Sequence, residues 1–260
     1  MINIIRSELS RLFKSKGFYI SIIIYIAIYV LCIFMQINAQ ESLGFQSGSI
    51  NEPGLYISVD TVITTMNAFA TTFGYIFGVL VLGIYLSSFV TFEYSSGFIK
   101  NIAVLSNGRK AAILSKIAVA FMMSVFILMI SYGLSFILGS SLIDSFEIES
   151  LSVILYSMSF LLLVSLAVFS LIIFICTLFK NKTAGIVLVF LITSGMLMPF
   201  ISSILDMIHL TSLSEYTLSY LFMNTVPTGG DLWVKAIFIS IFYIIVYNIL
   251  SIGITKKRDL

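Results

Sequence analysis

Six long runs of uncharged and mostly apolar residues divide the chain, and they predict helices that cross a membrane. The runs cover residues 17–40, 61–92, 117–143, 150–179, 183–205 and 236–255, and none of them contains Asp, Glu, Lys or Arg. A helix needs about 20 mostly apolar residues to cross the hydrocarbon core of a bilayer. We therefore predict six spans, over residues 17–38, 61–91, 115–140, 151–179, 183–205 and 232–255.

The composition agrees with this pattern. Of the 260 residues, 59% are apolar and only 10% are charged, whereas an average soluble domain has about 25% charged residues. This composition excludes soluble enzymes and free nucleic-acid-binding proteins, because too few charges are present to cover a water-exposed surface. We expect one all-α domain over residues 1–260, a polytopic membrane protein with six transmembrane helices and no nucleic-acid partner.

The positions of the charges predict an orientation. Of the 14 Lys and Arg residues, 13 lie before the first span, between spans two and three, between spans four and five, or after the sixth; Lys235 is the exception. The loops on the other side are acidic. Because cytoplasmic loops carry an excess of Lys and Arg, both termini are predicted to lie in the cytoplasm and the protein in the plasma membrane.

Residues 1–16 precede the first span and have helical periodicity. Ile2, Ile5, Leu9, Leu12 and Phe13 recur at steps of three and four. This spacing predicts an amphipathic helix at the cytoplasmic membrane surface. Its basic residues would face lipid headgroups: Arg6, Arg11, Lys14 and Lys16. The alternative is a charged flank that only fixes the orientation of the first span.

Few residues offer catalytic or metal-binding chemistry. The single histidine is His209, the two cysteines fall within predicted spans, and the chain contains no P-loop motif. We therefore expect no catalytic residue, bound metal or cofactor in this chain. The spans also lack internal ionisable residues, which proton-driven carriers usually need. Any uphill transport is expected to draw its energy from another polypeptide.

Polar residues gather in the second and fifth spans, which makes these spans candidate walls of a transport pathway. Thr and Asn residues cluster near the outer end of the second span, and the fifth span contains a Ser-Gly pair followed by Pro199, which is expected to kink the helix. The candidate pathway-lining residues are Thr64, Asn67, Thr71, Ser194 and Met198. Gly74 and Gly78, four residues apart, instead favour close packing between helices.

The segment 93–116 is longer than most helix connections and mixes apolar with basic residues. The spacing of Phe98, Ile99 and Ile102 suits a short helix with one apolar face open to a partner; the alternative is a helix folded onto the membrane surface. The segment 206–231 is also too long for a simple turn. Its spaced apolar residues predict short external helices between spans five and six.

These features together resemble the membrane subunits of ABC-2 type ABC transporters, and most closely the Gram-positive subgroup linked to export of, or immunity to, antimicrobial peptides. The resemblance rests on the order of elements and on local sequence. Family members typically have an acidic residue at the end of span two, a glycine four residues later, a basic pair and a Ser-Lys. The corresponding positions are Glu93, Gly97, Arg109-Lys110 and Ser115-Lys116.

The resemblance implies a permease subunit that forms half of a transport pathway. It would pair with a second copy of itself or with a sibling permease, and with a separate ATPase chain that holds ATP and Mg²⁺. The segment 93–116 would contain the coupling helix that docks into the ATPase. Its candidate residues are Glu93, Gly97, Phe98, Ile99, Ile102, Arg109 and Lys110, with Glu93 pairing with a base of the N-terminal helix or of this loop. An amphipathic peptide or lipophilic compound would be moved outward.

Two other functions remain open from the sequence. One is an ion-coupled secondary carrier that needs no ATPase, because backbone carbonyls at broken helices can bind Na⁺. The other is a membrane sensor or scaffold that transports nothing.

Overall fold

The computed structural model describes residues 2–44, 65–97, 108–143, 146–208, 210–223 and 229–257. Within these ranges the regular secondary structure is helical, apart from one isolated bridge between Thr65 and Glu147. The elements in chain order are α1 (Ile2–Lys14), α2 (Lys16–Gly44), α3 (Met66–Phe69), the π-helix η1 (Ala70–Tyr75), α4 (Ile76–Ser95), α6 (Gly108–Leu142), α7 (Leu151–Phe179), α8 (Lys182–Thr193), α9 (Leu197–Met207), the 3₁₀ helix η2 (Thr211–Tyr216), α10 (Leu218–Met223) and α11 (Gly230–Lys257).

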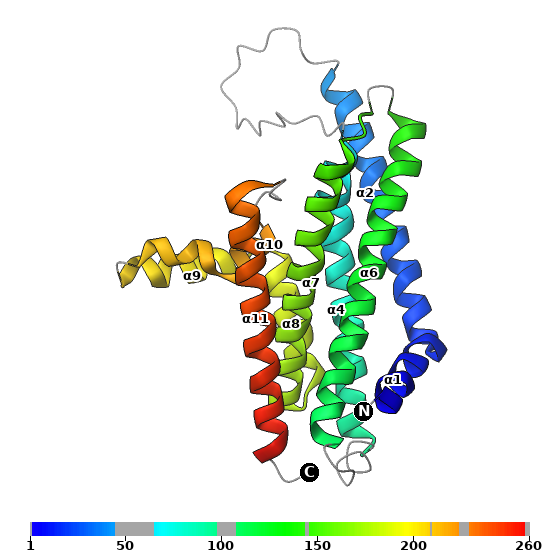
Figure 1. Ribbon diagram of the computed structural model, residues 1–260. Helices are drawn as coiled ribbons and strands as arrows, with labels where there is room; N and C mark the ends of the chain where they lie inside the picture. Colours follow the sequence, from blue (N-terminus) through cyan, green and yellow to red (C-terminus); the bar gives the residue numbers. More distant parts are fainter. Residues whose placement is uncertain are drawn as a thin grey trace.

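Five helical segments of the described chain are long and apolar enough to cross a membrane: α2, the continuous run α3–η1–α4, α6, α7 and α11. The pair α8–α9 makes a sixth if it counts as one span, but its two helices meet at 79°. Figure 1 shows the long helices side by side, with the start of α1 and the end of α11 at one end of the bundle, which we call the terminal end. The all-helical membrane architecture expected from the sequence is therefore confirmed in outline.

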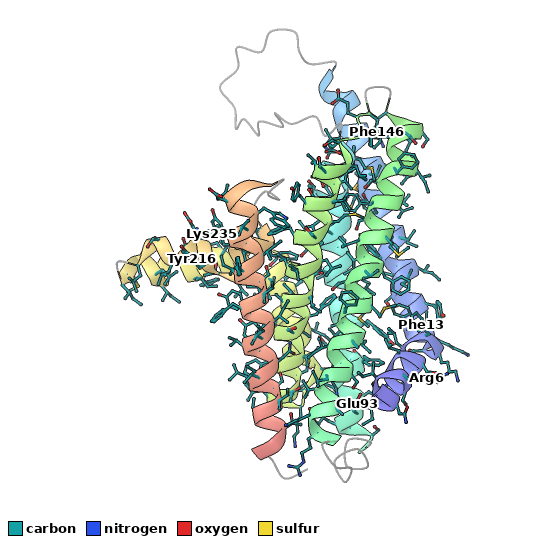
Figure 2. The ribbon with its side chains drawn as sticks, in the orientation of Figure 1. Arg6, Phe13, Glu93, Phe146, Tyr216 and Lys235 are labelled. Carbon is teal, nitrogen blue, oxygen red and sulfur yellow. The ribbon has the colours of Figure 1, made fainter. Side chains whose placement is uncertain are left out.

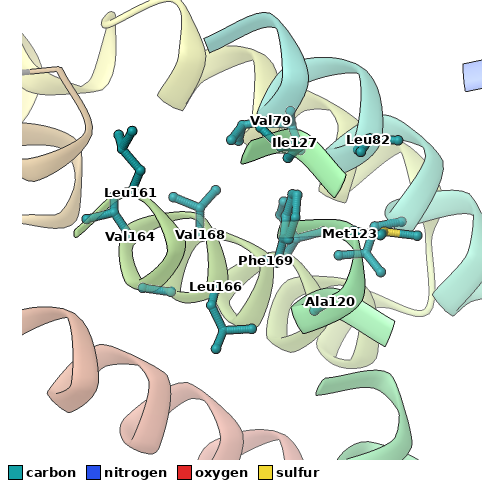
Figure 3. Close-up of a cluster of buried hydrophobic side chains, with 14 of the residues drawn as sticks. Val79, Leu82, Ala120, Met123, Ile127, Leu161, Val164, Leu166, Val168 and Phe169 are labelled. Carbon is teal, nitrogen blue, oxygen red and sulfur yellow. The ribbon is translucent and has the colours of Figure 1, made fainter. Parts of the chain in front are cut away.

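Helix α7 lies at the centre of the bundle. In its most apolar stretch 67% of the residues are buried, compared with 17% in α11 at the edge. Its core side chains pack between α4 and α6, as Figure 3 shows for Val79, Leu82, Met123, Val168 and Phe169. This packing sets α4, α6 and α7 as a common framework against which the other helices lie.

Two glycines of the second span permit close contact with α6 and α2. A Cβ atom at Gly78 would lie 2.7 Å from Cγ2 of Ile127, and one at Gly74 would lie 2.8 Å from Cβ of Ser131. Both distances are shorter than van der Waals contact allows. The spacing of Gly74 and Gly78 thus serves helix packing within one chain.

Two tyrosines of α2 bind serines of α6 beside these glycines. The hydroxyl of Tyr25 lies 2.7 Å from Oγ of Ser131, and the hydroxyl of Tyr29 pairs with Ser135. All four residues are buried. The later tyrosine pairs with the later serine, and both pairs are separated by four residues, so α2 and α6 run in the same direction. The two hydrogen bonds hold the helices in one register.

The fifth predicted span is broken rather than gently kinked. Helix α8 ends at Thr193, and Gly195 takes a φ of +73°, a left-handed conformation that side chains other than glycine's disfavour. Pro199 lies in the first turn of α9, where the absent N–H has no helical partner to lose. Gly195, not Pro199, therefore marks the break, which corrects the expectation from the sequence. Figure 1 shows α9 projecting sideways from the bundle.

Between α9 and α11 the chain forms two short helices, η2 and α10. A charged side chain at the start of α11 contacts η2. Nζ of Lys235 lies 3.0 Å from Oε2 of Glu215 and 4.3 Å from the ring centre of Tyr216, as the labels in Figure 2 indicate for Tyr216 and Lys235. This contact joins η2 to the start of the last span at the surface of the protein.

Candidate functional site

Four charged side chains meet at the terminal end of the bundle, where α1, α4 and α6 converge. The centre of this cluster is Glu93, in the last turn of α4, whose side chain is completely buried. Its Oε2 accepts a hydrogen bond from Nζ of Lys116 at 2.5 Å, and Lys116 is also completely buried. Glu93 and Lys116 therefore join α4 to α6 through a buried ion pair.

The N-terminal helix completes the cluster. Nη2 of Arg11 donates to Oε1 of Glu93 at 2.7 Å and lies 2.9 Å from Oε2 of Glu8. The guanidinium also stacks 4.0 Å from the ring centre of Phe89. Arg11 was expected to face lipid headgroups, but its charged group instead turns into the protein because two carboxylates and an aromatic face surround it there. Its contact with Glu93 agrees with the predicted pairing between Glu93 and a base of the N-terminal helix.

The cluster, which we define as Glu8, Arg11, Glu93 and Lys116, contains two negative and two positive groups. Both carboxylate oxygens of Glu93 are used, one by the partly exposed Arg11 and the other by the buried Lys116. Glu8 is less well compensated. Burial, with the negative charge of Glu93 nearby, raises the pKa of Glu8 to about 7, although Arg11 and Lys116 act in the opposite direction. Glu8 is thus the member whose charge changes near neutral pH.

The cluster lies at both ends of the connection between the second and third spans. Gly97, with a φ of +71°, follows the end of α4, and a glycine in this conformation is a common helix stop. Helix α6 begins at Gly108 and so includes Arg109 and Lys110, which the sequence had placed in the loop. Nη1 of Arg109 donates to the carbonyl of Thr255 on α11, and Lys110 is exposed. Phe98, Ile99 and Ile102 lie outside the described residues.

Comparison with known families decides the class of the protein. A family model described as "ABC-2 family transporter protein" matches residues 4–196, about three quarters of the chain. The chain belongs to the ABC-2 transporter family. A search of curated proteins gave no match. The family assignment makes the chain a membrane component of an ABC transporter, without catalytic chemistry of its own.

The matched region of this ABC-2 subunit runs from α1 to the break after α8. It contains all four residues of the charged cluster and the whole connection between the second and third spans. The helices α9, η2, α10 and α11 lie beyond the match.

The predicted pathway residues of the ABC-2 subunit fall in two places. Asn67 and Thr71 lie on α3 and η1, which pack against α6, whereas Ser194 and Met198 lie at the break between α8 and α9. Thr64 is outside the described residues. Asn67 already has protein partners, because its Oδ1 accepts from the hydroxyl of Tyr132 at 2.6 Å and its N–H donates to Glu149 at 3.1 Å. Asn67 therefore fastens the start of α3 to α6 and to the segment before α7.

The remaining predicted surface residues are Arg6, Lys14 and Lys16, and all three are exposed. Reasoning from the sequence did not single out Glu8. A signal was present, however, because Glu8 lies three residues after Ile5 and four before Leu12, on the apolar side of α1. A charge in that position must find a partner when the helix packs, and Arg11, three residues later, is the nearest candidate.

Proposed function

We propose that this ABC-2 subunit is the permease half of an ATP-driven exporter. It pairs with a second copy of itself or with a sibling permease, and a separate ABC ATPase binds to the connection between the second and third spans. ATP and Mg²⁺ are held by that ATPase. The termini lie in the cytoplasm, and α1 lies along the membrane surface there.

The observation that carries this proposal is the buried contact between Glu93 and Lys116. These residues lie at the two ends of the proposed docking segment, one in the last turn of α4 and the other in the third turn of α6. A force applied to the segment between them therefore reaches both helices at once. Arg11 extends the connection to α1.

Burial gives this connection its stiffness. In a site from which water is excluded, separating an ion pair leaves each charge without compensation, which is far more costly than at a surface. Movement of the docking segment is thus expected to carry α1, α4 and α6 together. Since α4 also packs against α8, the movement reaches the broken fifth span, where Gly195 supplies a flexible joint.

The proposed cargo is an amphipathic peptide or other lipophilic compound moved outward, with antimicrobial export or self-immunity as the biological role. This part of the proposal rests on the family resemblance rather than on a described binding site. The candidate walls of the pathway are the polar stretches of the second and fifth spans, at Thr64, Asn67, Thr71, Ser194 and Met198.

Copurification tests the docking assignment. An ABC ATPase without membrane spans that is encoded beside this gene would be coexpressed with the tagged subunit, and the amount of ATPase retained would be measured. Ile99→Asp with Ile102→Asp should abolish retention while leaving membrane insertion intact. The matched control is Ile148→Asp, an exposed isoleucine between α6 and α7, which should retain the ATPase. Full retention by the Ile99 and Ile102 variant would contradict the proposal.

Reconstituted vesicles distinguish the proposal from its two alternatives. Transport of an amphipathic peptide should require the ATPase and ATP hydrolysis. Flux driven by an ion gradient without the ATPase would instead identify a secondary carrier. If cells with a hydrolysis-dead ATPase still respond to a toxin, the protein is a sensor or scaffold.

A further inference from the structure

An apolar groove with a basic mouth runs along the junction of α7 and α8 at the terminal end of the bundle. The groove has a volume of about 410 Å³. Its apolar walls come from two elements, with Ile175 and Phe179 on α7 and Ala184, Val187, Leu188 and Leu191 on α8. Phe179 and Val187 are 61% and 51% exposed, so the groove opens outward from the bundle.

The packing of α8 explains why the groove exists. Val189 and Ile192 are buried on one side of α8, where the helix packs against α4 and α7. The residues that line the groove lie on the neighbouring side of α8, where Val187 is exposed and Ala184, Leu188 and Leu191 are half-buried. The turn at residues 180–181 brings α8 back beside α7 and leaves this side open.

The mouth of the groove is polar and positively charged. Asn181 and Thr183 line it, and the adjacent Lys180 and Lys182 are exposed. Neither lysine forms an ion pair with a residue that the structure describes. The sequence has no Asp or Glu between Glu149 and Asp206, so this part of the chain provides two positive charges without a local negative one.

We propose that this groove binds an anionic phospholipid. An acyl chain would lie against the apolar walls, and the phosphate would lie at the mouth between Lys180 and Lys182. The arrangement fits because the connection between α7 and α8 lies at the terminal end of the bundle (Figure 1). The ends of membrane-spanning helices lie close to the lipid headgroups. Lysines near a membrane surface attract anionic lipid with about 1 kcal/mol each. A zwitterionic lipid would gain only the apolar contact.

Native mass spectrometry of the purified, delipidated subunit tests the proposal. The protein would be titrated with phosphatidylglycerol and, separately, with phosphatidylcholine of the same acyl chains. One phosphatidylglycerol should bind with higher affinity than any phosphatidylcholine. K180Q with K182Q should weaken this binding by roughly 30-fold, or about fivefold for each lysine. The control is K235Q, at a lysine near the start of α11 that is already paired with Glu215; this variant should bind phosphatidylglycerol as the wild type does.

A fluorescence measurement locates the acyl chain. With W233F as background, V187W places a tryptophan in the groove, and I23W places one on the exposed side of α2. At one lipid per protein, phosphatidylglycerol with brominated chains should quench V187W and leave I23W bright. Glycerol 3-phosphate alone should not prevent this quenching at equal concentration, which distinguishes a bound lipid from a free phosphate.

Three outcomes would overturn the assignment. The first is unchanged phosphatidylglycerol binding by the K180Q and K182Q variant. The second is equal quenching at positions 187 and 23. The third is a change from dimer to monomer in the same spectra for A184F, a variant that fills the groove, without a change in bound lipid; this result would show that a second copy of the chain covers the groove.

Discussion

Lys116 on α6 and Glu93 on α4 form an ion pair in which neither side chain is exposed to solvent. Replacing only Glu93 by Gln would leave Lys116 buried without its charged partner. The expected loss is about 3–5 kcal/mol of folding free energy, which is typical when one member of a buried pair is removed. Thermal unfolding in detergent would measure this loss.

The double variant E93Q with K116Q provides the control, because it removes both charges of the pair. It should be less destabilised than the sum of the two single variants. A sum of independent effects would mean that the two groups do not interact in the folded protein.

Glu8 is expected to make the stability of the protein depend on pH. Burial raises its pKa from 4.5 to about 7 in the folded protein. Between pH 4.5 and pH 7, therefore, Glu8 keeps its proton in the folded state but not in the unfolded state. The stabilisation from this proton is complete below pH 4.5 and is lost as the pH rises through 7.

The measurement compares wild type with E8Q, which cannot lose this proton. The stability of the wild type relative to E8Q should be higher at pH 5 than at pH 8, by about 1–3 kcal/mol. An equal difference at the two pH values would show that Glu8 does not titrate in this range.

Gly78 should not tolerate a side chain. Valine at this position would collide with Ile127, since even a Cβ atom would lie 2.7 Å from its Cγ2. Overpacking of this kind costs about 1–3 kcal/mol. Gly133 on α6 provides a matched control, because a Cβ atom there meets nothing within 4 Å. The thermal midpoint of G78V should fall well below that of G133V, and equal midpoints would contradict the close contact.

Gly195 and Pro199 should respond differently to alanine. G195A places a side chain in a left-handed conformation with a φ of +73°, at a cost of about 1–2 kcal/mol. P199A replaces a proline in the first turn of α9, where proline is well tolerated, and should change the stability by less than about 1 kcal/mol. A larger loss for P199A, measured by thermal unfolding, would place the conformational constraint at the proline.

The sequence predicts the spans well because burial in a bilayer excludes charge over whole helices. It also brings Glu93 forward, since an acid at the edge of a span needs a partner. The sequence does not reveal which face of the N-terminal helix packs against which neighbouring helix. Glu8 lies on the apolar side of α1 and so needs a partner, but only the placement of α1 on α4 and α6 shows that Arg11 joins it to Glu93.

The break in the fifth span illustrates a second difficulty. Glycine and proline can each interrupt a helix, and the order of Gly195 and Pro199 along the chain does not show which of them ends α8. The decision depends on the position of each residue in its helix. A proline three residues into α9 loses no hydrogen bond, whereas Gly195 adopts a conformation that the helix cannot contain.

The two tyrosine–serine contacts between α2 and α6 repeat at an interval of four residues, and this has a mechanical consequence. If α2 moved along α6 by about one helical turn, or 5.4 Å, Tyr25 would come level with Ser135 and one of the two hydrogen bonds would form again. A shift of half a turn would leave both tyrosine hydroxyls without a serine. The contact between α2 and α6 therefore favours a few discrete positions along the helix axis rather than a continuous range of positions.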